Sequence, residues 1–300
     1  MTTLAILPLP ENRGLAFLGD EKRGSFEITS ACARRYLGAV NQNGKPNCDV
    51  VRPWIRAADV LRTPRHFWII DFPPGMDERE AVLYRQPFVR IQRHVRPTWG
   101  ERRECWWVHG DPRPEMRIAL AKRDRFIATT AVSKHRLFVW LPPEILPDHQ
   151  LIVFARDDDW FFGVLHSRFH QAWALRLGPR LREEESGGRY TPTTCFETFP
   201  FPWSPATPLG KLTRAQEEQR TAIAQAARAL DAVRAEWLGD RTDPRRTLTA
   251  LYDDRPAWLQ RAQAALDEAV AAAYGWPADL PDDDAITRLL ALNQDRSDRP

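Results

Sequence analysis

Short apolar runs that end at prolines or charged residues dominate the first two thirds of the chain. Four of them have the length of a strand and are rich in β-branched and aromatic residues, so they predict β-strands. These runs are HFWIID (66–71), RFIATT (125–130), SKHRLFVWL (133–141) and HQLIVFA (149–155). Two other segments, residues 76–84 and 113–122, have apolar side chains at helical spacing and predict helices.

Residues 159–177 carry the strongest helical pattern in this part of the chain, and the pattern predicts one continuous helix. One face of this helix holds Phe162, Leu165, Phe169, Ala172 and Trp173. The opposite face holds Gly163, His166, Ser167, His170, Gln171 and Ala174.

Beyond residue 205 the composition shifts to alanine, arginine, glutamate and glutamine, which favours helices. Apolar residues recur at heptad-like spacing in two segments: Ile223, Ala226, Leu230, Val233 and Trp237, then Leu259, Ala262, Leu266, Ala269 and Ala273. A shorter helix is predicted around Ile286, Leu289 and Leu290, and antiparallel packing would bury these faces. The sequence therefore predicts an α+β protein: a mixed α/β domain over residues 1–205 and a helical hairpin or bundle over residues 206–300.

The run TPTTCFETFPFPWSP (191–205) lies at this predicted boundary. Residues 193–198 can extend a last strand, after which the prolines enforce a stiff, extended exit. We expect Phe199, Phe201 and Trp203 to pack the exit onto the domain, and Thr213 to cap the helix that follows. The run is interpreted as a rigid joint.

Bulk composition sets broad limits. A hydrophobic content of 43% and a charged content of 28% are normal for a globular protein, and the net charge of +3 identifies no partner. Four cysteines without a C-x-x-C pair argue against a disulfide-dense scaffold or a zinc ribbon. Neither a signal peptide nor an apolar run of about 20 residues is found, so we expect a cytoplasmic protein without a membrane partner.

Signatures of catalysis are absent from the sequence. No Asn or Asp precedes a Pro-Pro-aromatic motif, and no G-x-G-x-x-G or Walker loop occurs. His166 and His170 have a spacing that can chelate zinc, but no third ligand or general base lies nearby. We therefore predict no catalytic residue and no metal site in this chain.

Basic residues concentrate between residues 85 and 136, where thirteen arginines and lysines outnumber five acids. Such a local surplus is typical of a surface that follows a DNA backbone. The alternative is a solvated face balanced by acids that fold nearby, such as residues 157–159. Strand alternation in SKHRLFVWL would place Lys134 and Arg136 on one face and Ser133 and His135 on the other.

Taken together, seven consecutive segments resemble the target-recognition portion of MmeI-like (type IIL/IIG) restriction-modification DNA methyltransferases. They are NGKPNCDVVRPW, FWIIDF, REAVLYRQPF, WWVHG…PEMRIAL, RFIATTAVSKHRLFVWL, QLIVFARDDDWFFGVLHSRFHQAWAL and RYTPTTCFETFPFPW. The segment LTALYDDRPAWLQRAQAALDEAVAAAYGWP is similar to that family's C-terminal helical segment.

This resemblance implies sequence-specific recognition of double-stranded DNA, as the specificity part of a site-specific adenine-N6 DNA methyltransferase. Family members carry a nuclease segment and a methyltransferase domain before this module, and neither is found here. The expectation is therefore that S-adenosylmethionine binds a missing catalytic domain, which a separate methyltransferase or nuclease chain would supply, and that this chain binds no cofactor. Whether the chain is such a split subunit or a truncated remnant stays open.

By the family's pattern, residues 133–136 are the first candidates for reading bases, and Ser167, Arg168 and His170 are the second. The arginines and lysines before them would hold the DNA backbone. The candidate DNA-binding residues are Arg113, Arg117, Lys122, Arg123, Arg125, Ser133, Lys134, His135, Arg136, Ser167, Arg168 and His170. The alternative function is a protein-interaction scaffold that uses the C-terminal heptad helices and binds no DNA.

Overall fold

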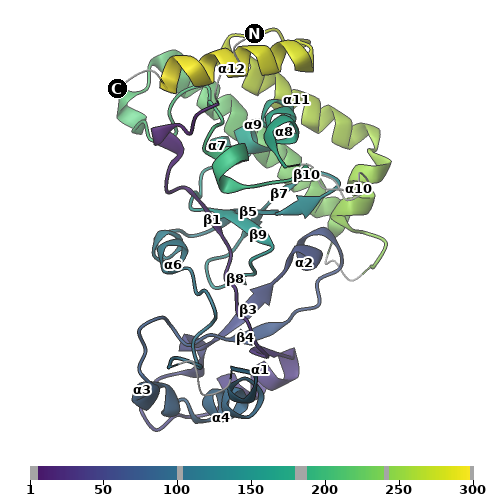
Figure 1. Cartoon of the computed structure of the whole chain (residues 1–300). Coiled ribbons are helices and arrows are strands. Elements are labelled where there is room, and N and C mark those ends of the chain that lie inside the picture. Colours follow the sequence, from purple (N-terminus) through teal and green to yellow (C-terminus); the bar gives the residue numbers. More distant parts are fainter. Residues whose placement is uncertain (1–5, 100–103, 180–187, 240–242, 298–300) are drawn as a thin grey trace.

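The computed structural model describes residues 6–99, 104–179, 188–239 and 243–297. Two lobes are visible in Figure 1, each built on a four-stranded sheet. Helices of the C-terminal third cover the upper lobe, and the lower lobe carries the shorter helices of the N-terminal third. The predicted α+β class, with its C-terminal helical segment, is confirmed.

The sheet of the upper lobe has the strand order β1-β9-β5-β7, and all three of its strand pairs are antiparallel. Its strands are β1 (Ala16–Leu18), β9 (Leu151–Phe154), β5 (Phe126–Thr130) and β7 (Phe138–Leu141). Every residue of β5 and of β9 is buried. A central strand that is covered on both faces reads as a continuous apolar run, which is why the sequence pattern identified these two.

The lower lobe contains the sheet β2-β4-β3-β8, in which only the short β8 runs parallel to its neighbour. Its strands are β2 (Glu27–Ile28), β4 (Trp68–Ile70), β3 (Val51–Ile55) and β8 (Leu146–Pro147). The helices of the N-terminal half are α1 (Ser30–Leu37), α2 (Ala57–Leu61), α3 (Glu78–Val82), α4 (Arg85–His94), α5 (Arg96–Trp99) and α6 (Pro114–Leu120). Because β8 comes from the chain between β7 and β9, it ties the two lobes together.

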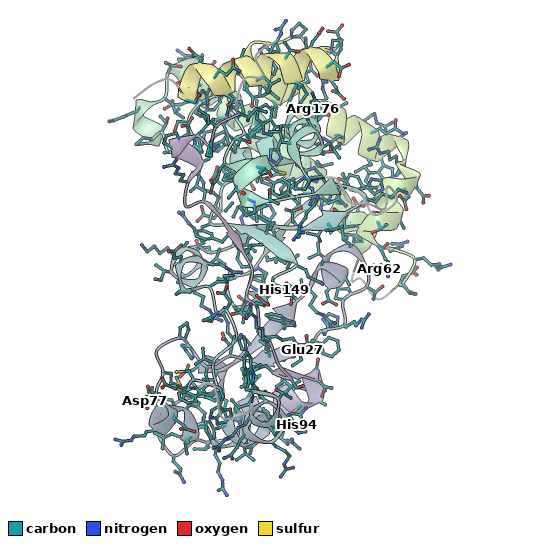
Figure 2. The ribbon with its side chains drawn as sticks, in the orientation of Figure 1. Glu27, Arg62, Asp77, His94, His149 and Arg176 are labelled. Atoms are coloured by element: carbon teal, nitrogen blue, oxygen red, sulfur yellow. The ribbon has the colours of Figure 1, made fainter. Side chains whose placement is uncertain are left out.

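A buried cluster of charged residues lies close to the junction of the lobes. Arg117 donates to Asp20 at 2.6 Å and to both oxygens of Asp71 at 2.7 Å. His109 lies 2.6 Å from Asp20 and 2.9 Å from the carbonyl oxygen of Ile70. The two aspartates and the histidine could hold a metal ion, but the guanidinium of Arg117 already engages both oxygens of Asp71 and one oxygen of Asp20. Figure 2 shows His149 in the same narrow middle of the molecule.

The predicted continuous helix over residues 159–177 is wrong. The segment forms α7 (Asp159–His166) and α8 (Arg168–Leu177), because Ser167 between them is extended, with ψ 155°. Side chains satisfy the carbonyl groups that the break leaves without helical partners: Ser167 donates to Val164, and His170 donates to Leu165 at 2.8 Å. The break lets α8 leave the axis of α7.

The C-terminal part forms α9 (Arg214–Leu238), α10 (Leu248–Asp254), α11 (Ala257–Tyr274) and α12 (Asp282–Ser297). Thr213 caps α9 as predicted, and Gln216 returns the hydrogen bond in a capping box. The side chain of Gln219, near the start of α9, donates to the carbonyl of Ala272, near the end of α11, so the two helices are antiparallel.

The helical segment shares its hydrophobic core with the upper sheet. Ile223, Leu230 and Leu266, at heptad positions, are fully buried. A Cβ atom on Gly163 of α7 would lie 2.7 Å from Ile223, so the glycine permits α7 and α9 to pack closely. The boundary predicted at residue 205 stays a prediction.

The proline-aromatic run differs in part from its prediction. Residues 192–196 form a π-helical turn instead of a last strand; the short strand β10 (Gly188–Arg189) ends before it and pairs with β6 (Val132–Ser133). Phe199, Phe201 and Trp203 are buried as predicted. Hydrogen bonds from the C-terminal helices fix the run: Tyr274 donates to the carbonyl of Pro200 at 2.8 Å, and Asn293 donates to that of Thr198 at 2.7 Å.

Among the described residues, no helix has both the length and the apolar character that crossing a membrane requires.

Candidate nucleic-acid interface

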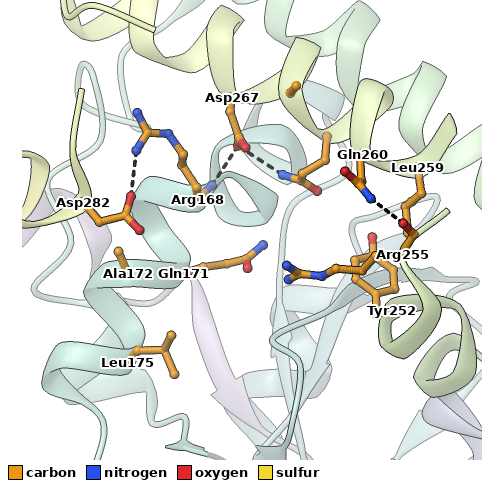
Figure 3. Close-up of a pocket in the computed structure, with 12 residues that line it drawn as sticks. Arg168, Gln171, Ala172, Leu175, Tyr252, Arg255, Leu259, Gln260, Asp267 and Asp282 are labelled. Atoms are coloured by element: carbon orange, nitrogen blue, oxygen red, sulfur yellow. Dashed lines mark hydrogen bonds and ion pairs between the residues drawn. The ribbon is translucent and has the colours of Figure 1, made fainter. Parts of the chain in front are cut away.

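A groove runs along the outer side of α8, between this helix and the corner where α10 meets α11. Two adjoining cavities of about 400 Å³ and about 120 Å³ form it. Both are lined by Gln171, Leu175, Tyr252 and Arg255, so they are continuous. We call this feature the α8 groove; Figure 3 shows its larger cavity.

One wall of the α8 groove is α8 itself. Arg168, Gln171 and Leu175 occupy successive turns of this helix and line the larger cavity, and Leu175 is 63% exposed. The orientation of the wall follows from the break at Ser167, because a continuous helix would carry these side chains along the axis of α7. The side-chain amide of Gln171 donates to the carbonyl of His166 at 2.9 Å, which further secures the break.

The start of α8 is held by a carboxylate from the opposite wall. Asp267 of α11 accepts from the backbone N–H of Arg168 at 2.8 Å and from the side chain of Gln263 at 3.1 Å (Figure 3). Burial raises the pKa of Asp267 to about 6, although these hydrogen bonds act in the opposite direction. Arg168 also forms an ion pair with Asp282 of α12 at 2.7 Å.

The second wall is the corner between α10 and α11. Arg255 ends α10 in the left-handed conformation, with φ 44°, and its carbonyl accepts from Gln260 at 2.6 Å. In Figure 3 its side chain points across the groove toward Gln171. The wall that faces α8 therefore presents arginine and glutamine side chains.

Residues 133–136 form the end of the groove that contains the smaller cavity. All four line it, together with Arg189 of β10. Lys134 and His135 both contact the carboxylate of Asp253, at 2.6 and 2.7 Å. Arg136 is buried, and burial lowers its pKa to about 10.

The strand alternation expected for residues 133–136 is wrong. β6 ends at Ser133 and β7 begins at Phe138, so the residues between them do not alternate. Ser133 is buried and its hydroxyl donates to the carbonyl of His135 at 2.7 Å, which makes a local turn. Lys134 is consequently exposed while Arg136 is buried, so the two do not share a face.

The structure brings five of the twelve candidate residues to the α8 groove: Ser133, Lys134, His135, Arg136 and Arg168. Ser167 and His170 are fully buried and serve the helix break, so their side chains do not reach the groove surface. The remaining five candidates, Arg113, Arg117, Lys122, Arg123 and Arg125, lie outside the groove lining.

Acids that fold nearby balance most of these outlying cations, as the alternative interpretation of the basic stretch expected. Arg123 pairs with Asp157 at 3.6 Å and Arg125 pairs with Asp159 at 2.6 Å. Arg113 pairs with Asp111 at 3.0 Å, and Arg117 belongs to the buried cluster between the lobes. Lys122 is exposed.

His166 and His170 do not form a metal site in this arrangement. They stand on different helices, and burial is the main reason that the pKa of each is lowered to about 3. Arg234 of α9 lies 2.7 Å from Nε2 of His166, and Tyr190 lies 3.0 Å from Nε2 of His170. Both imidazoles are neutral and their Nε2 atoms are engaged within the protein.

Sequence reasoning missed the groove residues that lie beyond the candidate segments. They are Arg189, Tyr252, Arg255, Gln260, Gln263 and Asp267. Most of them belong to the C-terminal part of the chain, for which the sequence predicts only a helical hairpin or bundle. No local signal identifies them, because they become neighbours of α8 only through tertiary packing.

Comparisons with known proteins agree with this architecture. Residues 115–203 match the sequence model of the family described as MmeI, target recognition domain. Among solved structures, the chain is similar to the type IIL restriction-modification enzyme MmeI in complex with DNA, with a TM-score of 0.66 and 18% identity. That match covers 98% of this chain and 38% of the MmeI chain. No curated protein matches the sequence. The family resemblance predicted from the sequence is confirmed, and the structural likeness establishes the fold.

Proposed function

We propose that this chain recognises a specific sequence in double-stranded DNA, as the specificity part of a restriction-modification system. The observation that carries this proposal is the match of residues 115–203 to a target-recognition domain, since the matched segment contains α8 and residues 133–136. The MmeI structure with the same fold was determined with DNA bound.

The chemistry of the α8 groove supports DNA reading. Arginine pairs with guanine and glutamine with adenine through two hydrogen bonds each in the major groove, which is about 12 Å wide and admits a helix. Gln171 and Arg168 on α8 supply these groups. Each such pair discriminates against a wrong base by about 1–3 kcal/mol.

The methyl transfer itself is assigned to a part of the system outside this chain. We propose that this part binds S-adenosylmethionine and methylates adenine at N6, while the α8 groove selects the site. The isolated chain should then incorporate no label from radioactive S-adenosylmethionine into DNA. Incorporation would show that the chain carries its own catalytic centre.

The scaffold alternative receives no support from the C-terminal helices. Their heptad residues Ile223, Leu230, Leu259 and Leu266 are buried within the chain, so they offer no open apolar face to another protein.

The test is selection of duplexes from a random library by the full chain, followed by fluorescence anisotropy with the enriched duplex. A specific motif should emerge, and Gln171→Ala should relax preference at one base pair by about 5- to 150-fold. Gln225→Ala, an exposed glutamine on α9, is the matched control and should leave the preference unchanged. Failure to bind any duplex at 50 mM salt would contradict the proposal.

A further inference from the structure

The smaller cavity of the α8 groove is lined by basic side chains. Among the described residues that line its volume of about 120 Å³ are Lys134, His135, Arg136, Arg189 and Arg255, and none of the lining residues is an aspartate or a glutamate. A water molecule takes up about 30 Å³ in the liquid, so the cavity has room for a compact polyatomic group. Its charge and size favour an anion.

Arg136 is the fixed element of this cavity. It is 8% exposed, and its guanidinium donates to the hydroxyl of Thr129 at 3.2 Å, to the carbonyl of Thr130 and to the carbonyl of Gly188 at 3.0 Å. It also lies over the ring of Tyr190, 4.9 Å from the centroid. The groups that hold it are all neutral.

The positive charge of Arg136 is therefore oriented but not neutralised. Within the described part of the chain no carboxylate forms an ion pair with it. A buried guanidinium is costly unless an anion lies beside it. An anion in the cavity would supply the missing partner.

Arg189 and Arg255 border the same cavity on exposed positions, one from β10 and one from the corner after α10. Neither forms an ion pair with a described residue, in contrast to Lys134 and His135, which Asp253 engages. A guanidinium binds phosphate through two parallel hydrogen bonds, so two arginines can grip one phosphate group from different sides.

We propose that this cavity binds one phosphate group of a DNA strand that lies in the α8 groove. Arg136 would provide the buried charge, and Arg189 and Arg255 would contact the phosphate oxygens. The inference rests on the proposed function and deepens it: a phosphate held here would fix the register of the strand against Gln171 and Leu175, which line both cavities.

The test compares the wild-type chain with the double variant Arg189→Gln/Arg255→Gln, which leaves the buried Arg136 in place. The control is Lys45→Gln/Arg214→Gln, which removes the same two charges from exposed pairs with Glu80 and Glu218. Affinity for a labelled 20-base-pair duplex is measured by anisotropy between 50 and 300 mM NaCl.

Because the two arginines share one phosphate, the double variant should lose about tenfold or more in affinity, and the slope of log K against log salt should fall by about one. A slope that falls by two would mean two separate phosphate contacts and would overturn the proposal. Unchanged affinity in the double variant would also overturn it, while leaving DNA recognition itself intact.

A second measurement separates the possible sources of the phosphate group. The unfolding temperatures of the wild type and of the double variant are measured in 10 mM inorganic phosphate and in chloride of equal ionic strength. If the wild type binds no duplex, the proposed function fails. If, in that case, phosphate raises the unfolding temperature of the wild type but not of the double variant, free phosphate is the ligand, and the proposal that the cavity binds a phosphate of a DNA strand is overturned. Absence of any effect would refute the cavity as an anion site.

Discussion

Asp267 shows how one side chain can link the two walls of the α8 groove. It lies on α11 but caps α8, whose own preceding residue, Ser167, uses its hydroxyl elsewhere. A carboxylate near a helix N-terminus is favourable, yet burial raises the pKa of this one to about 6. Its ionisation is therefore opposed by the fold.

The sign of the resulting pH dependence follows from that raised pKa. The folded chain binds the proton of the Asp267 carboxyl more tightly than the unfolded chain does. The stability that protonated Asp267 contributes is therefore complete below about pH 4 and is lost as the pH rises through about 6. Asp267→Asn retains an acceptor without the charge. Its free energy of unfolding relative to the wild type should rise by about 1–3 kcal/mol between pH 4 and pH 7 in urea titrations. A difference that is flat across this range would contradict the assignment.

Arg117 gives a second prediction at the residue scale. Burial alone would raise the pKa of Asp71, but the neighbouring Arg117 guanidinium, with Arg52, holds this pKa below its usual value. Arg117→Met leaves Asp20 and Asp71 buried without this partner and should cost about 3–5 kcal/mol in urea unfolding at pH 7. Lys122→Met, at an exposed position shortly after α6, should change stability by less than about 0.5 kcal/mol. If the two substitutions changed the free energy of unfolding equally, the ion pairs of Arg117 with Asp20 and Asp71 would make no specific contribution to stability.

At the scale of elements, α7 and α8 show which features of the sequence were predictive. The strands β5 and β9 could be predicted because each is an apolar run in the local sequence, and the cap at Thr213 could be predicted from the residues next to it. The break at Ser167 has no such local signal, because the periodicity of the apolar residues continues across it. Gln263 and Asp267, about 100 residues further along the chain, help to stabilise it.

The same reason limits prediction of the groove. Residues 133–136 were predicted as candidates from the family resemblance alone, and they do line the α8 groove. Ser167 and His170 belong to a polar helical face in the sequence, but their side chains satisfy carbonyl groups inside the protein. Which polar residues point outward is decided by the break, so it could not be derived from spacing.

Packing of α7 against α9 and α11 depends on Gly163. A Cβ atom there would lie 2.7 Å from Ile223 and 3.1 Å from Leu266. Gly163→Ala should therefore lower the free energy of unfolding by about 1–3 kcal/mol, despite the higher helix propensity of alanine. Gly38→Ala, where the nearest atom is 3.6 Å away, is the matched control and should be neutral or slightly stabilising. A stabilised Gly163→Ala chain would show that the helices are further apart than described.

On the scale of the whole molecule, the C-terminal third is part of the upper lobe rather than an appendage. Arg234 of α9 reaches the carbonyl of Phe138 in β7 at 3.0 Å and is only 2% exposed. Tyr252 and Arg255 line the α8 groove from the same part of the chain. Core and groove both depend on residues beyond 210.

A chain that ends at residue 210 should consequently fail to fold cooperatively, because α7 would lose the helices that cover it. Thermal unfolding should show no cooperative transition, and the truncated chain should aggregate. Co-expression of residues 211–300 as a separate polypeptide should restore a soluble complex. A soluble, cooperatively unfolding chain of residues 1–210 would show that the two parts are independent.

The contact of Asp253 with Lys134 and His135 also bears on how such a protein can change over evolutionary time. Lys134 and His135 belong to the segment that matches the family, whereas Asp253 lies outside it. A recombination event that exchanged only residues 115–203 would import one wall of the groove and keep the other. We expect lineages that acquire a new pair of residues at 134 and 135 to acquire a compensating residue at 253, so these positions should co-vary among homologues.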